Sequence, residues 1–314
     1  MTETQQFNNI QNNTPNIRIP DLGKIEGLSK EMPPSQLLNI FKQTCTNRYF
    51  EFETAKVYNT GIIKMPIYLS VGQEHIPAAV ASAHKNFRIF AQHRAHSYYL
   101  SFGGDMRKLI DELLHRETGC AKGMGGSASI HDPNIGMFGH SGLMGDQVPI
   151  AVGYALASKN KTLTVVGDAS AEEDYVWGAM GYAATKKCPI LLLCEDNDLS
   201  ILTHVSTRRS WNIVDIARSL GMPSVDIADD PCLIAHYVHQ FADQLPAVIN
   251  VRTCRNLWHA GTGKDNEPEW NRFEMFKLEL KNLGLEEQAS HIEKEARSMV
   301  EKIWQEQLQK PLKK

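Results

Sequence analysis

Two apolar runs joined by an alanine-rich segment occupy residues 163–203, and this stretch constrains the fold more than any other part of the chain. The first run, residues 163–166, stops at a Gly-Asp pair, and the second, residues 190–194, stops at the tripeptide Glu-Asp-Asn. Short apolar runs that flank a helical pattern predict the strand–helix–strand crossover of a parallel sheet. Because strand and helix patterns continue to alternate up to residue 252, we predict an α/β fold with a doubly wound parallel sheet and flanking helices.

Two polar residues, Asp168 and Asn197, directly follow the two predicted strands. A right-handed crossover places both carboxyl ends on one edge of the sheet, where open α/β sheets bind ligands. Carboxylate and amide oxygens suit Mg²⁺ or Ca²⁺ and suit zinc poorly. The Gly-Asp turn also leads into a helix N-terminus, which favours phosphate oxygens. The stretch therefore predicts a magnesium–diphosphate site, with a helix cap for Asp168 and a turn residue for Asn197 as the structural alternatives.

Composition excludes several classes of function. The net charge of −3 gives no reason to expect nucleic acid or a membrane surface as a partner. The six cysteines show no CxxC spacing and are interpreted as reduced, with those at 188 and 194 in the predicted core. No apolar run approaches the roughly 18 residues of a membrane span. Since the polar N-terminus also lacks the features of a secretory signal, we expect a cytoplasmic protein.

The chain divides into three parts by pattern. Residues 1–33 are rich in Asn and Gln without periodicity and are predicted to form a flexible arm, ordered at most on a partner subunit. Residues 34–285 form the main domain, and residues 286–314 form a C-terminal helix. Further helices are expected at 34–58, 73–84, 106–114, 148–157, 213–220 and 233–242, and further strands at 87–91, 224–227 and 247–252.

A glycine-rich segment spans residues 118–147 and contains eight glycines. A segment this long inside a compact domain is usually functional. A disordered linker is the alternative, but apolar residues are interspersed throughout the segment and helical patterns flank it closely.

Six segments, taken together and in order, resemble the alpha subunit of the decarboxylating component of thiamine diphosphate-dependent 2-oxo acid dehydrogenases. That family includes the pyruvate, branched-chain 2-oxo acid and acetoin dehydrogenases. The resemblance extends from about residue 35 to 285 and implies the thiamine diphosphate-binding fold, with thiamine diphosphate and Mg²⁺ as cofactors. The segments are VGQEHIPAAVA (71–81), RAHSYYL (94–100), GCAKGMGGS (119–127), GLMGDQVP (142–149), GDAS with EDN (167–170, 195–197) and RNLWHA (255–260).

The resemblance implies a metal site in which Asp168, Asn197 and the carbonyl of Leu199 bind Mg²⁺. It also implies that Arg94 reaches the diphosphate, a role suited to a planar fork of donors. His259 matches a family histidine beside the diphosphate and the substrate, where an imidazole could donate to phosphate and shuttle protons. The remaining implied cofactor contacts are His93 beside the arginine, Gly142 and Met144 under the bent cofactor, and Gly167, Ala169 and Ser170 at the diphosphate.

Several positions depart from the family pattern. Ala169 replaces the second glycine of the Gly-Asp-Gly motif, which narrows the allowed dihedrals. Asp196 replaces the first asparagine of the Asn-Asn pair. The other departures are near the substrate: Tyr68 for a histidine, His93 for a tyrosine, Leu257 for a histidine, and Trp258 and His140 near the cofactor mouth. The metal and diphosphate residues are therefore kept, and the substrate-proximal residues differ.

The function implied by the resemblance is the alpha subunit of a heteromeric enzyme. It would decarboxylate a 2-oxo acid and pass the acyl group to a lipoyl carrier on a dihydrolipoyl acyltransferase. Since the glutamate that activates the cofactor comes from a beta subunit, the resemblance implies an α₂β₂ assembly and an inactive isolated chain. Two alternatives remain: a two-subunit transketolase-like or acyloin-forming enzyme that transfers the unit to an aldehyde, and a non-catalytic scaffold subunit.

Overall fold

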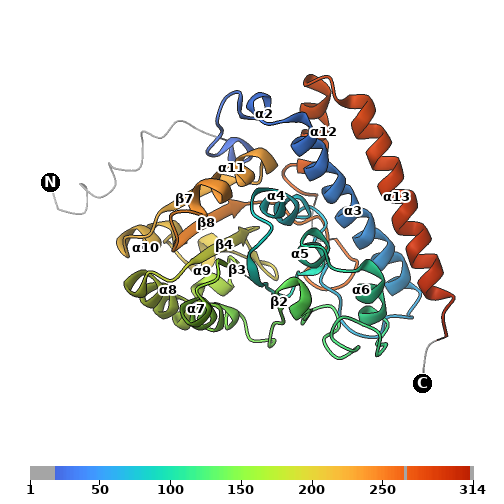
Figure 1. Ribbon diagram of the computed structural model, residues 1–314, viewed down its shortest axis with the longest axis horizontal. Coiled ribbons are helices and arrows are strands. Elements are labelled where there is room, and N and C mark those ends of the chain that lie inside the picture. The colour runs from blue at the N-terminus through green and yellow to red at the C-terminus, as the bar shows by residue number, and fades with distance from the viewer. Residues whose placement is uncertain (1–17, 265–266, 312–314) are drawn as a thin grey trace.

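A six-stranded parallel sheet forms the centre of the molecule, with the strand order β2-β1-β3-β4-β8-β7 (Figure 1). The computed structural model describes residues 18–264 and 267–311 of the 314-residue chain. The predicted doubly wound parallel sheet is confirmed. The strands of this sheet are β1 Arg88–Phe90, β2 Met137–Phe138, β3 Thr162–Gly167, β4 Ile190–Asp196, β7 Ser224–Ala228 and β8 Ala247–Arg252.

Side chains along the central strands alternate between two apolar clusters, one on each face of the sheet. On β3, Leu163 and Val165 belong to the larger cluster and Val166 belongs to the smaller one. Successive strand residues point to opposite faces, so a strand buried on both faces must be apolar throughout, as the sequence pattern showed. Helices α7 Gln147–Ser158, α8 Asp174–Lys186 and α10 Ile213–Ser219 contribute to the smaller cluster. Helices α3 Pro34–Asn59, α4 His75–Ala83, α5 His96–Ser101, α6 Met106–Leu113, α11 Pro231–Phe241, α12 Arg272–Asn282 and α13 Glu286–Leu308 contribute to the larger cluster.

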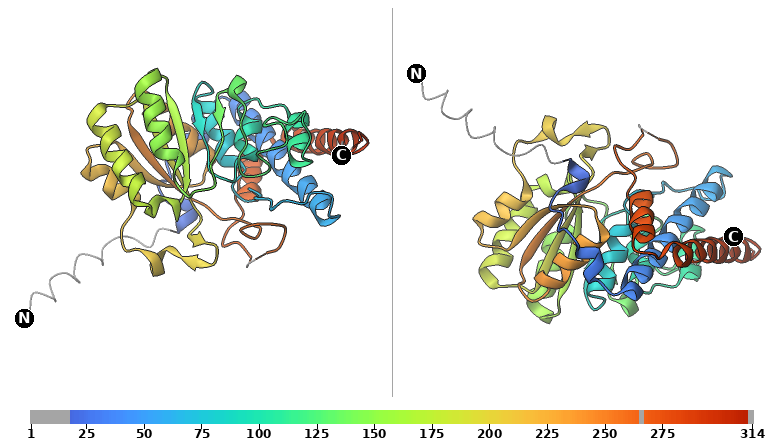
Figure 2. Two further views of the ribbon diagram at one scale, coloured as in Figure 1. Left: turned by 90° about the horizontal axis from the view of Figure 1, so that it is seen from below. Right: turned by 90° about the horizontal axis from the view of Figure 1, so that it is seen from above.

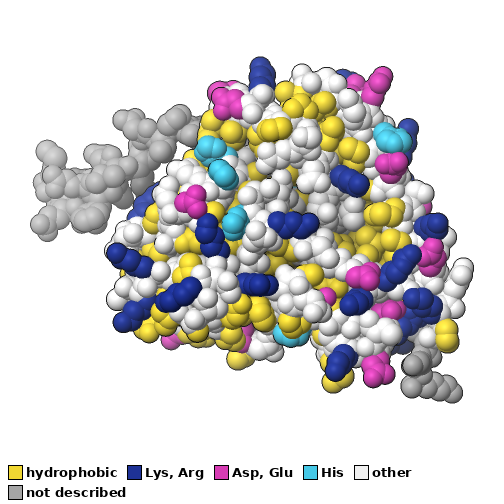
Figure 3. Space-filling view, viewed as in Figure 1, with side chains coloured by type: hydrophobic (Ala, Val, Ile, Leu, Met, Phe, Trp, Pro, Cys, Tyr) yellow, Lys and Arg dark blue, Asp and Glu magenta, His cyan; other side chains and the backbone are white. Residues whose placement is uncertain are grey.

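The predicted C-terminal helix is α13, which packs along α3 at one end of the molecule (Figures 1 and 2). The buried ring of Trp304 lies 5.8 Å from that of Phe50, and Tyr49 donates a 2.8 Å hydrogen bond to Glu293. Figure 3 shows acidic and basic side chains interspersed over α13 and α6, the solvated side of this layer. Within the described ranges, no helix, α3 and α13 included, is long and apolar enough to cross a bilayer.

The first part of the glycine-rich segment folds around a buried carboxylate, that of Glu112. The backbone N–H groups of Ala121, Gly123, Gly125 and Gly126 donate to this carboxylate at 2.7–3.1 Å. A Cβ at Gly125 would lie 2.1 Å from the Ser129 carbonyl oxygen, so glycine is required at this close approach. Hydrogen bonds to α6 therefore hold the first part of the segment in place, which argues against the linker alternative.

Part of the predicted arm is instead packed on the main domain. Residues 18–33 include η1 Ile19–Asp21 and α2 Leu28–Glu31, and the Leu22 carbonyl accepts a hydrogen bond from the Ala228 N–H at the end of β7. The prediction of a flexible arm is therefore wrong for these residues, because their backbone groups find partners on β7 and α12. Residues 1–17 lie outside the described residues, and the three-part domain division stays a prediction.

Several elements had no counterpart in the sequence analysis. Helix α5 is buried on all sides and therefore has no amphipathic pattern to detect. Helix α12 does have apolar residues at helical spacing, and that signal was missed. The others are the η2 Pro133–Ile135 and η3 Ser170–Glu172 turns, β2, the hairpin of β5 Leu199–Ser200 with β6 Thr203–His204, and α9 Val205–Arg208.

Candidate active site

The carboxyl ends of β1, β3 and β4 meet around a small cavity of about 40 Å³, and the loop after β8 adds His259 to its lining. Nearly every residue predicted to bind the cofactor or metal lines it, although the outermost of them, His93 and His259, are 166 positions apart in the sequence. The exception is Gly142, which lies in the same loop as the lining residue Met144 but is not part of the lining. The predicted residues that line the cavity are His93, Arg94, Met144, Gly167, Asp168, Ala169, Ser170, Asn197, Leu199 and His259.

Asp168 is buried at the floor of this cavity, with 2% of its surface exposed. Burial, together with the nearby charge of Asp196, raises the pKa of Asp168 to about 6. The guanidinium of Arg208 opposes that shift, since it donates to the Asp168 carboxylate and also to Glu172. The guanidinium of Arg208 therefore pairs with Asp168, the predicted metal ligand.

Asn197 and Leu199 form a turn that presents both residues to the cavity. The Asn197 Oδ1 accepts the Leu199 N–H at 3.2 Å, and the Asn197 Nδ2 donates to Gln73 at 3.1 Å. Asp198 between them has a φ of +63°, a left-handed conformation that carboxylate residues tolerate. The turn predicted as the structural alternative is present, and the same turn places the Asn197 amide and Leu199 at the cavity.

Two buried polar atoms at the cavity have no hydrogen-bond partner among the described residues, the Ser170 Oγ and the His93 Nδ1. The His93 Nε2 accepts from Arg94 Nη1 at 3.3 Å, so a neutral ring carries its proton on Nδ1. Burial, reinforced by Arg94, holds the pKa of His93 well below its usual value. Unpartnered donors in a buried site fit an anionic ligand such as a diphosphate.

The alanine in the Gly-Asp-Gly position does not distort this site. Ala169 has φ −71° and ψ −40°, a right-handed helical conformation open to any L-residue. The restriction expected at Ala169 therefore has no consequence here. Asp196 is also compensated, since its carboxylate accepts from Arg252 at 2.7 Å and lies outside the cavity lining.

Arg94 connects the cavity to the loop that carries His259. Its Nη2 donates to the His259 carbonyl at 2.9 Å and lies 3.5 Å from the His259 Nδ1, and its Nε donates to the Leu69 carbonyl at 3.3 Å. Burial lowers the pKa of Arg94 to about 10, so it stays charged at neutral pH. Since arginine can only donate, the Nδ1 of His259 accepts and its Nε2 is the protonated nitrogen of the neutral ring.

Aromatic rings converge at the mouth of the cavity, and three of these residues are departures from the family pattern. The ring of Tyr68 lies 4.8 Å from that of His93 and 5.9 Å from that of His259. The ring of His93 lies 6.3 Å from that of His140. Three of the positions that differ in sequence, Tyr68, His93 and His140, are therefore neighbours in space at one end of the cavity.

Sequence reasoning assigned no role to two buried polar residues at the cavity, Gln92 and Glu195, although Glu195 belongs to the EDN motif and Gln92 lies two residues before RAHSYYL. Glu195 accepts from the Tyr98 hydroxyl at 2.9 Å and from the Gln92 amide. Burial raises the pKa of Glu195 to about 7. Arg208 was also missed, because a charged residue in a surface-like sequence gives no sign that it reaches Asp168.

Arg208→Met is expected to tighten Mg²⁺ binding about tenfold, because a cation and the guanidinium compete for the Asp168 carboxylate. Titration calorimetry with Mg²⁺ and the implied cofactor would measure this. Arg209→Met is the matched control, since Arg209 pairs with Glu172 at 3.2 Å and packs on Trp211 without bonding to Asp168. Weaker Mg²⁺ binding in Arg208→Met would contradict the competition.

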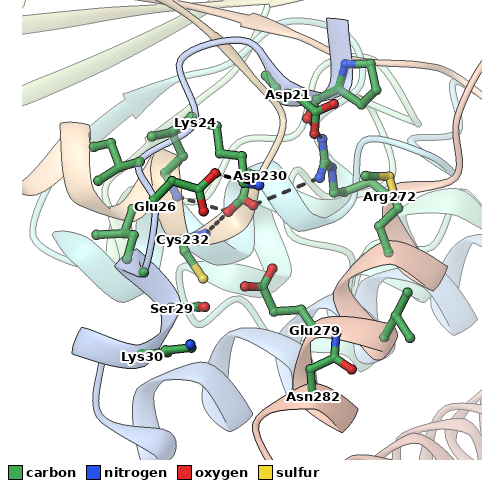
Figure 4. A pocket seen from close by; sticks show the side chains of 18 of the residues that line it. Asp21, Lys24, Glu26, Ser29, Lys30, Asp230, Cys232, Arg272, Glu279 and Asn282 are labelled. Atoms are coloured by element: carbon green, nitrogen blue, oxygen red, sulfur yellow. Dashed lines mark hydrogen bonds and ion pairs between the residues drawn. The ribbon is translucent and has the colours of Figure 1, made fainter. Parts of the chain in front are cut away.

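A larger cavity of about 510 Å³ lies elsewhere, between residues 20–30, the start of α11 and α12 (Figure 4). Its wall carries both signs of charge, including Lys24, Glu26, Asp230 and Arg272. None of the residues predicted to bind the cofactor lines it. The smaller cavity at the strand ends is therefore the candidate active site.

The fold and this cavity define an α/β protein with a polar ligand site at the carboxyl ends of parallel strands. A family model described as "Dehydrogenase E1 component" matches residues 42–261, which is more than half of the chain and includes every predicted site residue. The chain belongs to this family, as a subunit of the alpha type in thiamine diphosphate-dependent 2-oxo acid dehydrogenases. Membership implies thiamine diphosphate as the cofactor.

Individual relatives agree with this assignment. The chain is 29% identical to the pyruvate dehydrogenase E1 component subunit alpha of Rickettsia bellii over 256 residues, 76% of each chain. It is 34% identical over 181 residues to the mitochondrial alpha subunit of Dictyostelium discoideum, covering 56% of this chain and 47% of that one. A transketolase structure from Campylobacter jejuni superposes with a TM-score of 0.58 at 17% identity, covering 89% of this chain and 49% of the transketolase, and shows the shared fold alone.

Proposed function

We propose that the chain is the alpha subunit of a heteromeric enzyme that decarboxylates a 2-oxo acid and passes the acyl group to a lipoyl carrier. The observation that carries this proposal is the meeting of Asp168, Asn197, Arg94 and His259 at one cavity. A scaffold subunit with a decayed site is less well supported, because such a site would have no reason to keep these residues together.

In this proposal Asp168, the Asn197 amide oxygen and the Leu199 carbonyl hold Mg²⁺, whose preferred ligands are oxygens. Arg94, His93 and Ser170 donate to the diphosphate. When bound, thiamine diphosphate supplies the carbon nucleophile and the electron sink for loss of carbon dioxide. His259, held by Arg94, moves protons at the mouth of the cavity through its Nε2.

The test is co-expression with a beta-type subunit, followed by assays with 2-oxo acids and a lipoyl domain. Reductive acylation of the lipoyl domain by the pair, and no such activity of the isolated chain, is the expected result. Activity of this polypeptide alone would contradict the dependence on a beta subunit.

The exposed surface of α7 and α8 has features that favour contact with a partner subunit. Ile150 is 55% exposed and Tyr182 is 48% exposed, and the helical glycines Gly153 and Gly178 have open space where a Cβ would lie. Ile150 and Gly153 are three residues apart, as are Tyr175 and Gly178, so each pair shares one helix face. Glycine inside a helix costs about 0.5–1 kcal/mol relative to alanine, which a close approach of another chain would offset. We assign this face to the beta subunit.

Tyr182→Glu is expected to weaken assembly with the beta subunit by at least about 100-fold, because a charge would be buried without a partner. Size-exclusion chromatography of the co-expressed pair would measure the loss. Leu278→Glu is the control, since Leu278 is 58% exposed but lies on α12, outside this face. Unchanged assembly of the Tyr182 variant would show that the beta subunit docks elsewhere.

A second candidate function is transfer of the two-carbon or acyl unit to an aldehyde, with thiamine diphosphate as the same cofactor. It is motivated by the clustering of Tyr68, His93 and His140, three departures from the family pattern, at one end of the cavity. Incubating the αβ pair with 2-oxo acids and aldehydes separates the two candidates. Acyloin products without acylated lipoyl domain would select this second candidate.

A further inference from the structure

A buried chain of hydrogen bonds runs from α3 to the segment beside the candidate active site. The Glu51 carboxylate lies 2.9 Å from the His96 Nδ1, and the His96 Nε2 lies 2.9 Å from the Ser127 Oγ. All three side chains are at most 1% exposed. His96 and Ser127 belong to two of the sequence motifs that characterise the chain, yet neither lines the cofactor cavity.

The groups at the two ends of this series of hydrogen bonds determine which atom donates in each bond. The Glu51 carboxylate also accepts from the Ser70 backbone N–H at 3.1 Å and the Ser70 hydroxyl at 2.8 Å. Because an acceptor carboxylate faces the Nδ1 of His96, a neutral ring carries its proton there, and its Nε2 accepts from the Ser127 hydroxyl. Ser127 Oγ is then left to accept the Tyr68 N–H at 3.0 Å. The acidic, imidazole and hydroxyl groups have the order of a catalytic triad, but burial keeps the Ser127 hydroxyl away from any substrate.

Glu51 and Ser127, at the two ends of this series of hydrogen bonds, both bond to the same stretch of backbone. This stretch is residues 67–72, which we call the central segment. It has no helix or strand, and Ile67, Leu69 and Val71 are buried. Buried backbone outside regular structure must find other hydrogen-bond partners. On one side of the central segment, its N–H groups at Tyr68 and Ser70 bond to the Ser127 and Glu51 side chains.

The carbonyls on the other side of the central segment accept hydrogen bonds from the loop that carries His259. The Gly261 N–H donates to the Ile67 carbonyl and the Asn256 N–H donates to the Val71 carbonyl, both at 2.8 Å. These two bonds flank His259, and between them the Leu69 carbonyl accepts from Arg94. A Cβ at Gly72, whose φ is +98°, would lie 2.4 Å from the Cys254 carbonyl oxygen, so the two backbones are in direct contact.

We propose that Glu51, His96 and Ser127 are positioning residues, which fix the His259 loop and Arg94 through the central segment. The effect of these residues on catalysis rests on the proposed function. Their coupling to the His259 loop through the central segment does not. When Ser127 loses its hydroxyl, the Tyr68 N–H and the His96 Nε2 lose their partners together. The central segment then opens more readily, and the two loop bonds open with it.

Hydrogen exchange at the amides of Asn256 and Gly261 tests the coupling without any need for catalysis. Ser127→Ala in the full chain is expected to speed exchange at both amides about tenfold, the effect of removing one buried hydrogen bond. The matched control is Thr54→Val, which removes an equally buried hydroxyl on the same helix as Glu51 but one that bonds only to the Phe50 carbonyl, at 2.8 Å. If both variants change these amides equally, the coupling is overturned.

A second readout tests the catalytic meaning with the αβ pair. Ser127→Ala is expected to lower kcat about tenfold at saturating cofactor, while Thr54→Val with a similar loss in melting temperature stays within about twofold. An unchanged kcat in Ser127→Ala would overturn the positioning role. If Ser127→Ala fails to fold, Glu51→Gln serves the same comparison, since the amide has one acceptor oxygen where the carboxylate has two and so cannot accept from both Ser70 and His96 in this arrangement. An inactive wild-type pair would contradict the proposed function, and the exchange result would still decide the coupling.

Discussion

Asp168→Asn is expected to weaken binding of thiamine diphosphate with Mg²⁺ by at least about 100-fold in the assembled enzyme, and to abolish decarboxylation with it. Changes in groups that only support a metal ligand already cost 10–100-fold in affinity, so neutralising a charged ligand should cost at least as much. The carboxylate is buried at the cavity floor, and no other acid in the cavity lining except Glu195 could replace it. Calorimetry with the cofactor and Mg²⁺ measures the affinity directly.

Asp196→Asn is the matched control for this prediction. It also neutralises a 2%-exposed aspartate at the same sheet edge, but Asp196 pairs with Arg252 and does not line the cavity. We expect this variant to change the affinity by less than about tenfold. Equal losses in the two variants would mean that the charge of the sheet edge matters, and that Asp168 is not a specific ligand.

His259→Ala is expected to lower kcat of the αβ pair by about 100-fold or more, the range lost with a general acid or base. The cofactor affinity should fall much less, because Asp168, Asn197 and Arg94 keep their positions on other elements. Steady-state kinetics at saturating cofactor, together with calorimetry, separates the two effects. Arg94 loses only its contact with the ring, since its bond to residue 259 is made to the backbone carbonyl.

His291→Ala provides the control for His259, since it removes an exposed imidazole on α13 that pairs with Glu295. That variant should keep wild-type kcat. If His259→Ala instead lost cofactor affinity by the same factor as kcat, the imidazole would contribute to binding and not to proton transfer.

The sequence predicted the centre of the sheet well because both faces of β3 and β4 are buried. Continuous apolar runs at 163–166 and 190–194 are a local property, and they place Asp168 and Asn197 at the ends of β3 and β4. The parallel crossover then requires both residues to lie on one edge. The same reasoning failed at residues 18–33, whose order depends on backbone partners that are distant in sequence.

The motifs shared with the family predicted most residues of the candidate site, including Met144 and His259, and the strand ends indicated Asp168 and Asn197 as well. Arg94, Asp168 and Asn197 follow strands and were found, whereas Arg208 was not, because its partner lies 40 positions away on another loop. The hydrogen-bonded series of Glu51, His96 and Ser127 was likewise not predicted from the sequence. Its three members come from α3, α5 and the glycine-rich segment, and no local pattern relates them.

What the sequence by itself determined is therefore the order of the elements, the sheet class and the residues at the strand ends, since each depends on local polarity and spacing. The tertiary structure alone decided which side chains touch. It placed Arg208 on Asp168, gathered Tyr68, His93 and His140 at the mouth of the cavity, and joined the central segment to the His259 loop. Such contacts form between segments that are far apart in the sequence, so the pattern of neighbouring residues does not predict them.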